Sequence, residues 1–353
     1  MLDARYYRFF TLLAQSLASI VVGLEALWKY NPSIFVDTVG FSFIYPFAKY
    51  LYAARVICYV HYPTISSDML EKVQHRITDF NNASIIAKSS YFSQIKLIYY
   101  HLFSFLYYLA GSCADLVFVN SSWTLNHIQT IWKSPSAKIL FPPCDTKDLM
   151  TIPLQPRERI ILSVAQFRPE KAHVMQIDAF HKLLKDHPEY RFTGKSPVKL
   201  VLLGGVRNQM DQKLVDGLRN KIRDLELNDS ITIVMNASHS QLKEYYRKST
   251  MGLHTMRDEH FGIGVVEYMA AGLIPLAHGT AGPMMDIVVP FNEKPTGFLA
   301  TSIEEYAEKM QIILELSNQE KLELQKRARE SVLVRFSNET FSELISKYIQ
   351  AFL

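Results

Sequence analysis

The hydrophobic positions change their spacing several times along the chain, and this change predicts an alternation of helices and strands. From Phe10 to Trp28 apolar residues recur every three or four positions, the spacing of an amphipathic helix with one buried face. Beyond Pro32, short runs rich in β-branched residues alternate with helical patterns, as in βα units around a parallel sheet. The strands predicted in this half are residues 34–38, 55–60, 115–120 and 138–141.

A second alternating series follows a proline-rich break at residues 142–158. We therefore expect an α/β protein with two Rossmann-like, doubly wound domains, residues 1–150 and 151–336, and a C-terminal helix at 337–353. Two such domains in tandem face each other across a cleft in which ligands bind. The strands predicted here are 159–164, 198–203, 231–235, 251–255 and 273–277, and the helices are 174–184, 211–225, 240–248, 264–271 and a long tail after residue 302.

Residues 97–113 depart from this pattern because they contain no charged side chain and many aromatic ones. Seventeen uncharged residues lie at the lower edge of the ~17–25 that span a bilayer, and tyrosine favours the membrane interface over the hydrocarbon. We favour a helix in the headgroup region, while a buried core helix and a membrane span stay open. The predicted membrane-interface residues are Tyr99, Tyr100, Phe103, Phe105, Tyr107 and Tyr108.

Composition narrows the class of protein. The 353 residues are 48% apolar and 20% charged, which is typical of folded domains. Three cysteines without C-x-x-C spacing argue against a disulfide framework and favour a reducing compartment. Residues 1–157 hold 13 lysines and arginines against 9 acids, whereas residues 158–353 hold 25 of each. This charge is too weak for binding nucleic acid and suits a first half that rests on an anionic membrane.

Several catalytic motifs fail on inspection. Residues 193–196 resemble the end of a phosphate loop, but Glu189 stands where that loop needs a glycine. Gly262, Gly264 and Glu267 resemble a dinucleotide fingerprint that lacks its third glycine, so an NAD enzyme is not expected. G-x-S-x-G, H-E-x-x-H and D-x-D are absent from the sequence. We therefore expect neither a serine hydrolase nor a bound metal or cofactor.

Residues 258–267 are the main candidate for chemistry. Gly262, Ile263 and Gly264 open a predicted helix, where unpaired N–H groups and the helix dipole can hold a phosphate. Glu259 precedes that helix and Glu267 lies about two turns into it, up to ~12 Å further along the axis. A nucleotide sugar would fit this arrangement, with its diphosphate in the middle. The alternative, to which we give equal weight, is that Glu259 is a solvated loop residue and that Glu267 is a charged residue on the exposed face of the helix.

Two further candidates follow predicted strands. Arg168 and Lys171 come after the first strand of the second half and would supply positive charge to a phosphate. A surface ion pair with Glu170 is the alternative for Arg168. His61 ends a strand of the first half, where its imidazole would enter the same cleft from the opposite wall. A lone histidine is more often structural, so that interpretation also stays open.

These elements together resemble the glycosyltransferases of GT-B fold and family four, whose signature E-x7-E runs here from Glu259 to Glu267. The chain is most similar to the branch that transfers mannose in α-1,2 linkage to a dolichyl-diphosphate-linked oligosaccharide, on the cytosolic face of the endoplasmic reticulum membrane. The resemblance covers residues 8–336. The segments that carry it are 58–66, 119–124, 141–145, 167–171 and 259–267.

The resemblance implies a retaining transfer of mannose from GDP-mannose without a metal. It implies that Arg168, Lys171 and the backbone of residues 262–264 neutralise the departing diphosphate. Glu259 would contact the mannose, Glu267 the ribose, and His61 the sugar from the first domain. The implied partners are GDP-mannose, the dolichyl-diphosphate-linked oligosaccharide, the membrane surface and other mannosyltransferases of N-glycan precursor assembly.

Two departures from the family pattern keep other functions open. Ala281 stands where the family commonly has a second glycine, and no strand with a glycine-rich loop is predicted before Ile34. We therefore expect a first domain that is incomplete at its N-terminus. The alternatives are a catalytically inactive nucleotide-sugar-binding or membrane-scaffold protein, and a soluble glycosyltransferase with another donor.

Overall fold

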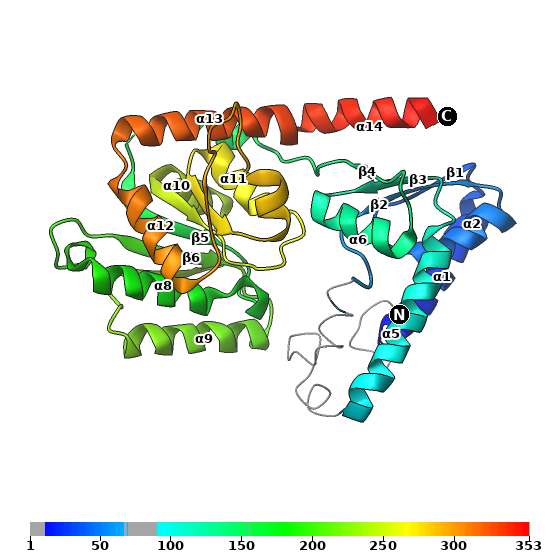
Figure 1. Cartoon of the computed structure of the whole chain (residues 1–353), viewed down its shortest axis with the longest axis horizontal. Helices are drawn as coiled ribbons and strands as arrows, with labels where there is room; N and C mark the ends of the chain where they lie inside the picture. The colour runs from blue at the N-terminus through cyan, green and yellow to red at the C-terminus, as the bar shows by residue number, and fades with distance from the viewer. Residues whose placement is uncertain (1–10, 67–68, 70–89, 155, 353) are drawn as a thin grey trace. The chain divides into compact units, whose positions relative to one another are not determined.

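The computed structural model describes residues 11–66, 69, 90–154 and 156–352, which form two units (Figure 1). The first unit is Met1–Leu140 with Ile349–Leu353, and the second is Phe141–Tyr348. The division therefore falls about ten residues before the expected boundary after residue 150, and most of the expected C-terminal helix belongs to the second unit. The chain joins the second unit at Phe141 because that ring packs 5.7 Å from the ring of Phe261 and 5.1 Å from that of Phe336.

The first unit is built on a four-stranded parallel sheet in the order β1-β2-β3-β4. Its inner strand β2 is buried from Val56 to Val60, the continuous apolar run expected of a parallel strand covered by helices. The strands are β1 (Ile34–Asp37), β2 (Arg55–Val60), β3 (Leu116–Val119) and β4 (Lys138–Ile139), and the helical elements are α1 (Thr11–Tyr30), η2 (Ser42–Ile44), α2 (Tyr45–Leu51), α5 (Ser90–Gly111) and α6 (Ser122–Trp132).

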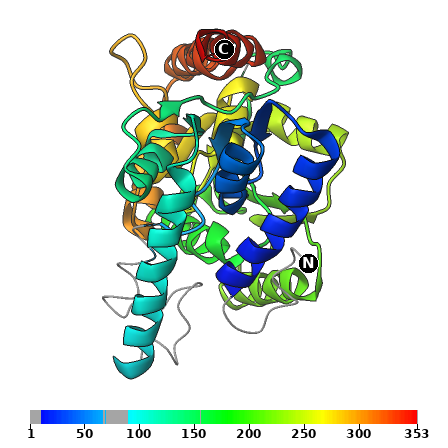
Figure 2. The ribbon, with the colours of Figure 1, turned by 90° about the vertical axis from the view of Figure 1, so that its right-hand side faces the viewer.

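Helices α1 and α5 lie against each other in the first unit. The N–H of Leu13 in α1 donates a hydrogen bond of 3.2 Å to the hydroxyl of Tyr99 in α5. On the inner side of α5, Phe103 and Tyr107 enter the core, where the rings of Tyr107 and Trp132 are 5.1 Å apart. Figure 1 and Figure 2 both show the first turns of α5 extending beyond the sheet of this unit.

Within the described part of the chain, α1 is the one helix long and apolar enough to cross a membrane by length and composition. Core helices of soluble proteins and signal sequences share this property. In α1, 28% of the apolar stretch is buried inside the protein.

The second unit is built on a six-stranded parallel sheet in the order β10-β9-β8-β5-β6-β7. Strands β8 and β9 are buried along their whole length, so helices shield both from solvent. The strands are β5 (Glu158–Val164), β6 (Lys199–Gly204), β7 (Ile231–Met235), β8 (Ser249–Leu253), β9 (Ile274–His278) and β10 (Phe298–Ala300).

Side-chain caps mark where several helices of the second unit begin. Asn208 accepts hydrogen bonds from two N–H groups at the start of α9, and Ser238 and Ser317 form capping boxes with Gln241 and Glu320. The helices are α7 (Lys147–Met150), α8 (His173–Asp186), α9 (Gln209–Asp224), α10 (His239–Lys248), α11 (Ile263–Ala271), α12 (Ile303–Glu315), α13 (Asn318–Phe336) and α14 (Asn338–Phe352), with shorter helical turns η3 (Pro169–Lys171), η4 (Pro188–Tyr190) and η5 (Pro283–Ile287).

The structure confirms the predicted alternation of strands and helices. Each of the predicted strands is present, with its ends within two residues of those expected. Strand β10 was not predicted because it has only three residues, too few for a periodic pattern. The helical tail after Ser302 consists of the three helices α12, α13 and α14.

Candidate active site

The second sheet has a topological switch point between β5 and β8. From β5 the chain builds β6 and β7 on one side, and it then returns to build β8, β9 and β10 on the other. Ligands of doubly wound sheets bind at such a point, beyond the carboxyl ends of the strands. The loops that follow β5 and β8, residues 165–172 and 254–262, therefore form the candidate site.

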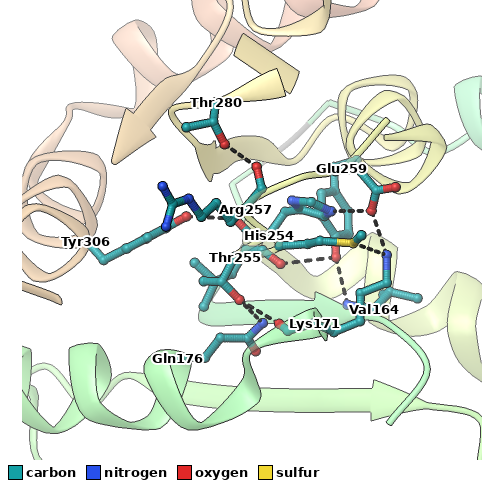
Figure 3. Close-up of polar contacts among 12 residues, drawn as sticks. Val164, Lys171, Gln176, His254, Thr255, Arg257, Glu259, Thr280 and Tyr306 are labelled. Carbon is teal, nitrogen blue, oxygen red and sulfur yellow. Dashed lines mark hydrogen bonds and ion pairs between the residues drawn. The ribbon is translucent and has the colours of Figure 1, made fainter. Parts of the chain in front are cut away.

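The carboxylate of Glu259 is held there by Lys171 and His254 (Figure 3). Lys171 Nζ lies 2.5 Å from Glu259 Oε2, and His254 Nε2 lies 3.1 Å from the same oxygen. Burial on its own would raise the pKa of Glu259, but the hydrogen bond and charge of His254 and the charge of Lys171 outweigh it and lower the pKa to about 2. Glu259 is therefore an anion at neutral pH, although its side chain is only 17% exposed.

Buried hydrogen bonds join the two loops that carry these residues. Gln176 Nε2 donates to Thr255 Oγ1 at 2.7 Å, and Thr255 Oγ1 donates to the carbonyl of Lys171 at 2.8 Å. Gln176 and Thr255 are both buried. Hydrogen bonds between buried groups are strong in the low dielectric of the interior and restrict the positions of both partners. It fixes the backbone of Lys171 relative to the loop that carries Glu259 (Figure 3).

Helix α11 begins beside Glu259. Gly262, its N-cap, has a φ of +110°, in the left-handed region that favours glycine. The N–H groups of Ile263 and Gly264 have no protein acceptor among the described residues, as is usual in the first turn of a helix. These donors and the positive end of the helix dipole can bind a phosphate group.

Glu267 lies further along α11 in a different environment. Tyr246, which is buried, donates a hydrogen bond of 3.2 Å from its hydroxyl to Glu267 Oε2. Burial raises the pKa of Glu267, and the hydrogen bond from Tyr246 partly opposes this. The two predicted carboxylates thus flank the start of α11, one before it and one on it, and Tyr246 orients the second.

Arg168 forms an ion pair with Glu170, which the sequence had left open as the alternative to a phosphate-binding role. Its Nη1 lies 3.7 Å from Glu170 Oε1, and both side chains are about one-third exposed. An exposed pair at this separation contributes little stability. The guanidinium can therefore turn to a phosphate at small cost.

The loop after β9 packs closely onto the same site. The N–H of Gly282 donates to the carbonyl of Glu259 at 2.9 Å, and a Cβ on Gly282 would lie 2.5 Å from the carbonyl oxygen of Phe261. Ala281 has a φ of +51°, so an alanine occupies the left-handed conformation that glycine adopts freely. Thr280 donates a hydrogen bond to the carbonyl of Arg257, which also holds this loop to the site.

His61 belongs to the first unit, where it follows β2 directly. Asn120 Nδ2 donates to the carbonyl of His61 at 2.8 Å, and Asn120 Oδ1 accepts a hydrogen bond of 2.7 Å from Thr124. The His61 ring lies 4.7 Å from that of Tyr59. The structure thus places His61 at the carboxyl end of its strand, as expected, while its approach to a sugar bound by the second unit stays a prediction.

The structure corrects the predicted membrane-interface residues of α5. Tyr100, Phe103 and Tyr107 are buried in the core of the first unit and cannot face lipid. Tyr99 and Tyr108 are half-buried, the first through its hydrogen bond to α1 and the second beneath Lys133, whose Nζ lies 5.5 Å from the ring centre. Of the six residues, only Phe105 is well exposed, at 56%. The exposed face of α5 is largely aliphatic and consists of Ile95, Ile98, Leu102, Phe105, Leu106 and Leu109.

A separate cavity of about 200 Å³ lies at the amino ends of β5 and β8 and has a structural role. Arg157, which lines it, donates hydrogen bonds to the carbonyls of Tyr246 and Ala271, at the carboxyl ends of α10 and α11. Cations at helix carboxyl ends stabilise the unpaired carbonyls and the dipole there. The positive charge of Arg157 is therefore balanced by these carbonyl groups.

His254, Thr255, Gln176 and Tyr246 support the site but were not predicted from the sequence. His254 and Thr255 carried a signal, because they are polar residues that directly follow the apolar run 251–253. Gln176 and Tyr246 carried none, since their partners come from distant segments. Among the described residues, no group of three or more His, Cys, Asp or Glu side chains is placed to hold a metal ion.

Comparison with known proteins identifies the class of protein. Residues 147–331 match the family described as "Glycosyl transferases group 1", and residues 1–132 match "ALG11 mannosyltransferase N-terminus". The chain therefore belongs to the group 1 glycosyltransferases. More narrowly, it belongs to the family of "GDP-Man:Man(3)GlcNAc(2)-PP-Dol alpha-1,2-mannosyltransferase" proteins, because several proteins of that name share more than 40% of its sequence.

Three relatives illustrate this similarity, and the chain spans about 70% of their length. The mouse protein is 48% identical over 96% of this chain and 69% of its own length. The human protein is 47% identical over 97% of this chain and 70% of its own, and the Dictyostelium discoideum protein is 44% identical over 99% and 69%.

Solved structures share the fold at much lower identity. A glycosyltransferase from Rickettsia africae superposes with a TM-score of 0.65 at 17% identity, over 95% of this chain and 81% of that one. An α,α-trehalose 6-phosphate synthase from Burkholderia multivorans gives 0.74 at 10% identity, over 98% and 78%. The predicted α/β, GT-B fold class is thereby confirmed.

Proposed function

We propose that this chain transfers mannose in α-1,2 linkage from GDP-mannose to a dolichyl-diphosphate-linked Man(3)GlcNAc(2) oligosaccharide. The observation that carries the proposal is the pairing of Lys171 with Glu259 at the start of α11, in a chain that matches relatives named for this reaction over nearly its whole length. Each part of the site suits one part of the donor.

The diphosphate would bind at the start of α11. The N–H groups of Ile263 and Gly264 supply fixed donors, and Gly262 lets the backbone approach closely. Lys171 and Arg168 add mobile positive charge from the loop after β5. Positively charged groups that are already in place stabilise the negative charge that develops on GDP as it departs. In the proposed reaction this step therefore needs no metal ion.

The sugar and the ribose would bind on either side of the diphosphate. Glu259 is ionised and held in place, so it can accept hydrogen bonds from mannose hydroxyls. Glu267, oriented by Tyr246, would accept from the ribose hydroxyls of GDP. His61 would contact the sugar from the first unit, where Asn120 holds its backbone.

The acceptor of the named relatives carries a dolichol lipid, so we propose that the first unit rests on the membrane that holds it. Ile98, Leu102, Phe105 and Leu109 project from one face of α5 at intervals of three or four residues, and Ile98 and Leu102 are 69% and 58% exposed. An apolar helix face of this kind can enter the headgroup region of a bilayer. The three cysteines are free thiols, which suits the cytosolic face of the endoplasmic reticulum membrane. Association with other mannosyltransferases stays a prediction of the family resemblance.

A transfer assay tests the proposal. The full chain, reconstituted in vesicles, is incubated with GDP-mannose and dolichyl-diphosphate-linked Man(3)GlcNAc(2), and the extended glycan is detected by mass spectrometry after release from the lipid. We expect α-1,2-linked mannose in the product, with undiminished yield in EDTA. Binding of GDP-mannose without transfer would instead support an inactive nucleotide-sugar-binding protein, and transfer only from another nucleotide sugar would contradict the proposed donor.

A further inference from the structure

We propose that His254 is a positioning residue that holds Glu259 in its sugar-binding orientation, independently of Lys171. The inference rests on the proposed function, because it concerns the carboxylate assigned there to the mannose. It starts from a geometric fact: His254 and Lys171 both contact Oε2 of Glu259, at 3.1 and 2.5 Å. Within the described part of the chain, Oε1 accepts no hydrogen bond, so this is the oxygen available to a ligand hydroxyl.

The direction of the bond from His254 follows from the state of its partner. Glu259 has a pKa of about 2, so its carboxylate is ionised and can only accept hydrogen bonds. Nε2 of His254 must therefore carry a proton and donate it. This makes the contact a charge-assisted hydrogen bond, which is stronger than a bond between neutral groups.

Hydrogen bonds hold both the backbone N–H and the backbone carbonyl of His254 in place. The N–H of His254 donates to the carbonyl of Leu276 in β9 at 2.9 Å, and its carbonyl accepts a hydrogen bond of 2.9 Å from the hydroxyl of Tyr306 in α12. The residue is 7% exposed and directly follows β8. A donor mounted on the end of a central strand is more precisely placed than one on a loop.

Lys171 is held less rigidly than His254, and it has a second role. It ends the short turn η3 and reaches Glu259 through a long, flexible side chain that is 23% exposed. In the proposed function its charge belongs to the diphosphate. When Lys171 turns to the phosphate oxygens, His254 remains as the partner of the Glu259 carboxylate. Without this partner a largely buried anion would be unpaired and unfavourable, so His254 keeps Glu259 charged and oriented.

Three variants separate this role from a structural one. His254→Phe keeps a ring of similar shape and removes the donor, whereas His254→Gln restores an N–H donor at the end of a chain of comparable length. His187→Phe is the matched control: it removes another contact between a histidine and a glutamate of the same unit, in which His187 Nδ1 lies 3.2 Å from Glu189 Oε1, outside the loops of the candidate site. Thermal unfolding of each variant reports whether the fold is kept.

The measurements are kcat for mannose transfer and the Kd of GDP, which lacks the sugar. A charge-assisted hydrogen bond that acts on the sugar predicts that His254→Phe lowers kcat about ten- to hundredfold and changes the Kd of GDP less than about threefold. His254→Gln should recover most of kcat, and His187→Phe should resemble the wild type. Equal losses in His254→Phe and His254→Gln at unchanged stability, or wild-type kcat in His254→Phe, would overturn the proposal.

A measurement without turnover keeps this inference separate from the proposed function. ¹⁵N NMR of the imidazoles, in the wild type and in Glu259→Gln, reports which nitrogen of His254 carries the proton. We expect Nε2 to be protonated in the wild type and its resonance to move in the variant. An Nδ1–H tautomer with bare Nε2 would overturn the role of His254 even if the wild type transfers mannose. Absence of transfer by the wild type, with the expected tautomer, would overturn the proposed function alone.

Discussion

Lys171 Nζ lies 2.5 Å from Oε2 of Glu259, although the two residues are 88 positions apart in the sequence. The contact joins the loop after β5 to the loop after β8, across the switch point of the second sheet. The positive charge of Lys171 is thus balanced within the protein itself. In the proposed function the diphosphate has to compete with Glu259 for this cation, and this competition can be measured.

The substitution Glu259→Gln should separate donor binding from transfer. Glutamine keeps the size of the side chain but not its charge, so Lys171 becomes free for the diphosphate while the sugar loses its anionic acceptor. We expect transfer to fall at least about 100-fold, the usual magnitude for loss of one preorganised polar contact at a reacting centre. The Kd of GDP should stay the same or decrease, as measured by titration calorimetry.

Two other glutamates of the second unit serve as comparisons. Glu267→Gln should raise the Kd of GDP itself, because that carboxylate is assigned to the ribose. Glu244→Gln should leave both quantities unchanged, since Glu244 is exposed and pairs only with Arg247 and Lys248 among the described residues. A weaker affinity for GDP in Glu259→Gln, equal to that in Glu267→Gln, would contradict the assignment of the two carboxylates to opposite ends of the donor.

The substitution Lys171→Met should act mainly on donor binding. Methionine keeps most of the side-chain length and removes the charge, so the diphosphate loses one charge-assisted contact worth about 1.5–3 kcal/mol. The KM for GDP-mannose should therefore rise about ten- to hundredfold in the transfer assay. Lys182→Met is the control, because Lys182 forms an exposed pair with Asp186 one turn away on α8. An unchanged KM in Lys171→Met would remove this lysine from the donor site.

The low pKa of Glu259 predicts a specific dependence of stability on pH. Its pKa is about 2 in the folded protein, below the ordinary value of 4.5, so ionisation of this group favours folding. That contribution is complete above about pH 5 and is lost as the pH falls towards 2. It should be of the order of a few kcal/mol, since one pKa unit corresponds to about 1.4 kcal/mol. Chemical unfolding at a series of acidic pH values measures it.

Glu259→Gln provides the reference for that measurement, because it lacks the titrating group and keeps the others. The stability of the wild type should fall more steeply with acidification than that of the variant. Two parallel curves would mean that Glu259 has an ordinary pKa and that its contacts with Lys171 and His254 are not maintained in solution.

The sequence predicted the elements of this site better than the contacts within it. The spacing of Glu259 and Glu267 around Gly262 placed the start of α11 correctly, because glycine and an apolar run signal a helix start locally. The pairing of Glu259 with His254 and Lys171 had no local signal. It depends on β5 and β8 being neighbours in the sheet, although three helices and two strands separate them along the chain.

For helix α5, too, the sequence alone could not predict which side chains are buried. Tyr100, Phe103 and Tyr107 are spaced by three and four residues, and so are Ile98, Leu102 and Phe105 on the other face. Both faces are apolar, so periodicity predicts a helix without saying which side is buried. Packing against Trp132 in α6 and the bond from Leu13 in α1 decide it, and both come from other segments of the chain.

This correction gives a direct test of membrane docking by the first unit. Leu102→Asp places a charge on the exposed aliphatic face of α5, where it opposes entry into the headgroup region. We expect the variant to lose most of its binding to vesicles of phosphatidylcholine and phosphatidylserine in a sedimentation assay, with an unchanged melting temperature. Gln129→Asp adds the same charge at an exposed polar position of α6, away from that face, and should bind as the wild type does. Phe103→Ala should instead lower stability by about 3–5 kcal/mol, because it opens a cavity beside Phe43, whose ring lies 5.4 Å away. Wild-type sedimentation of Leu102→Asp would show that the membrane contact lies elsewhere in the chain.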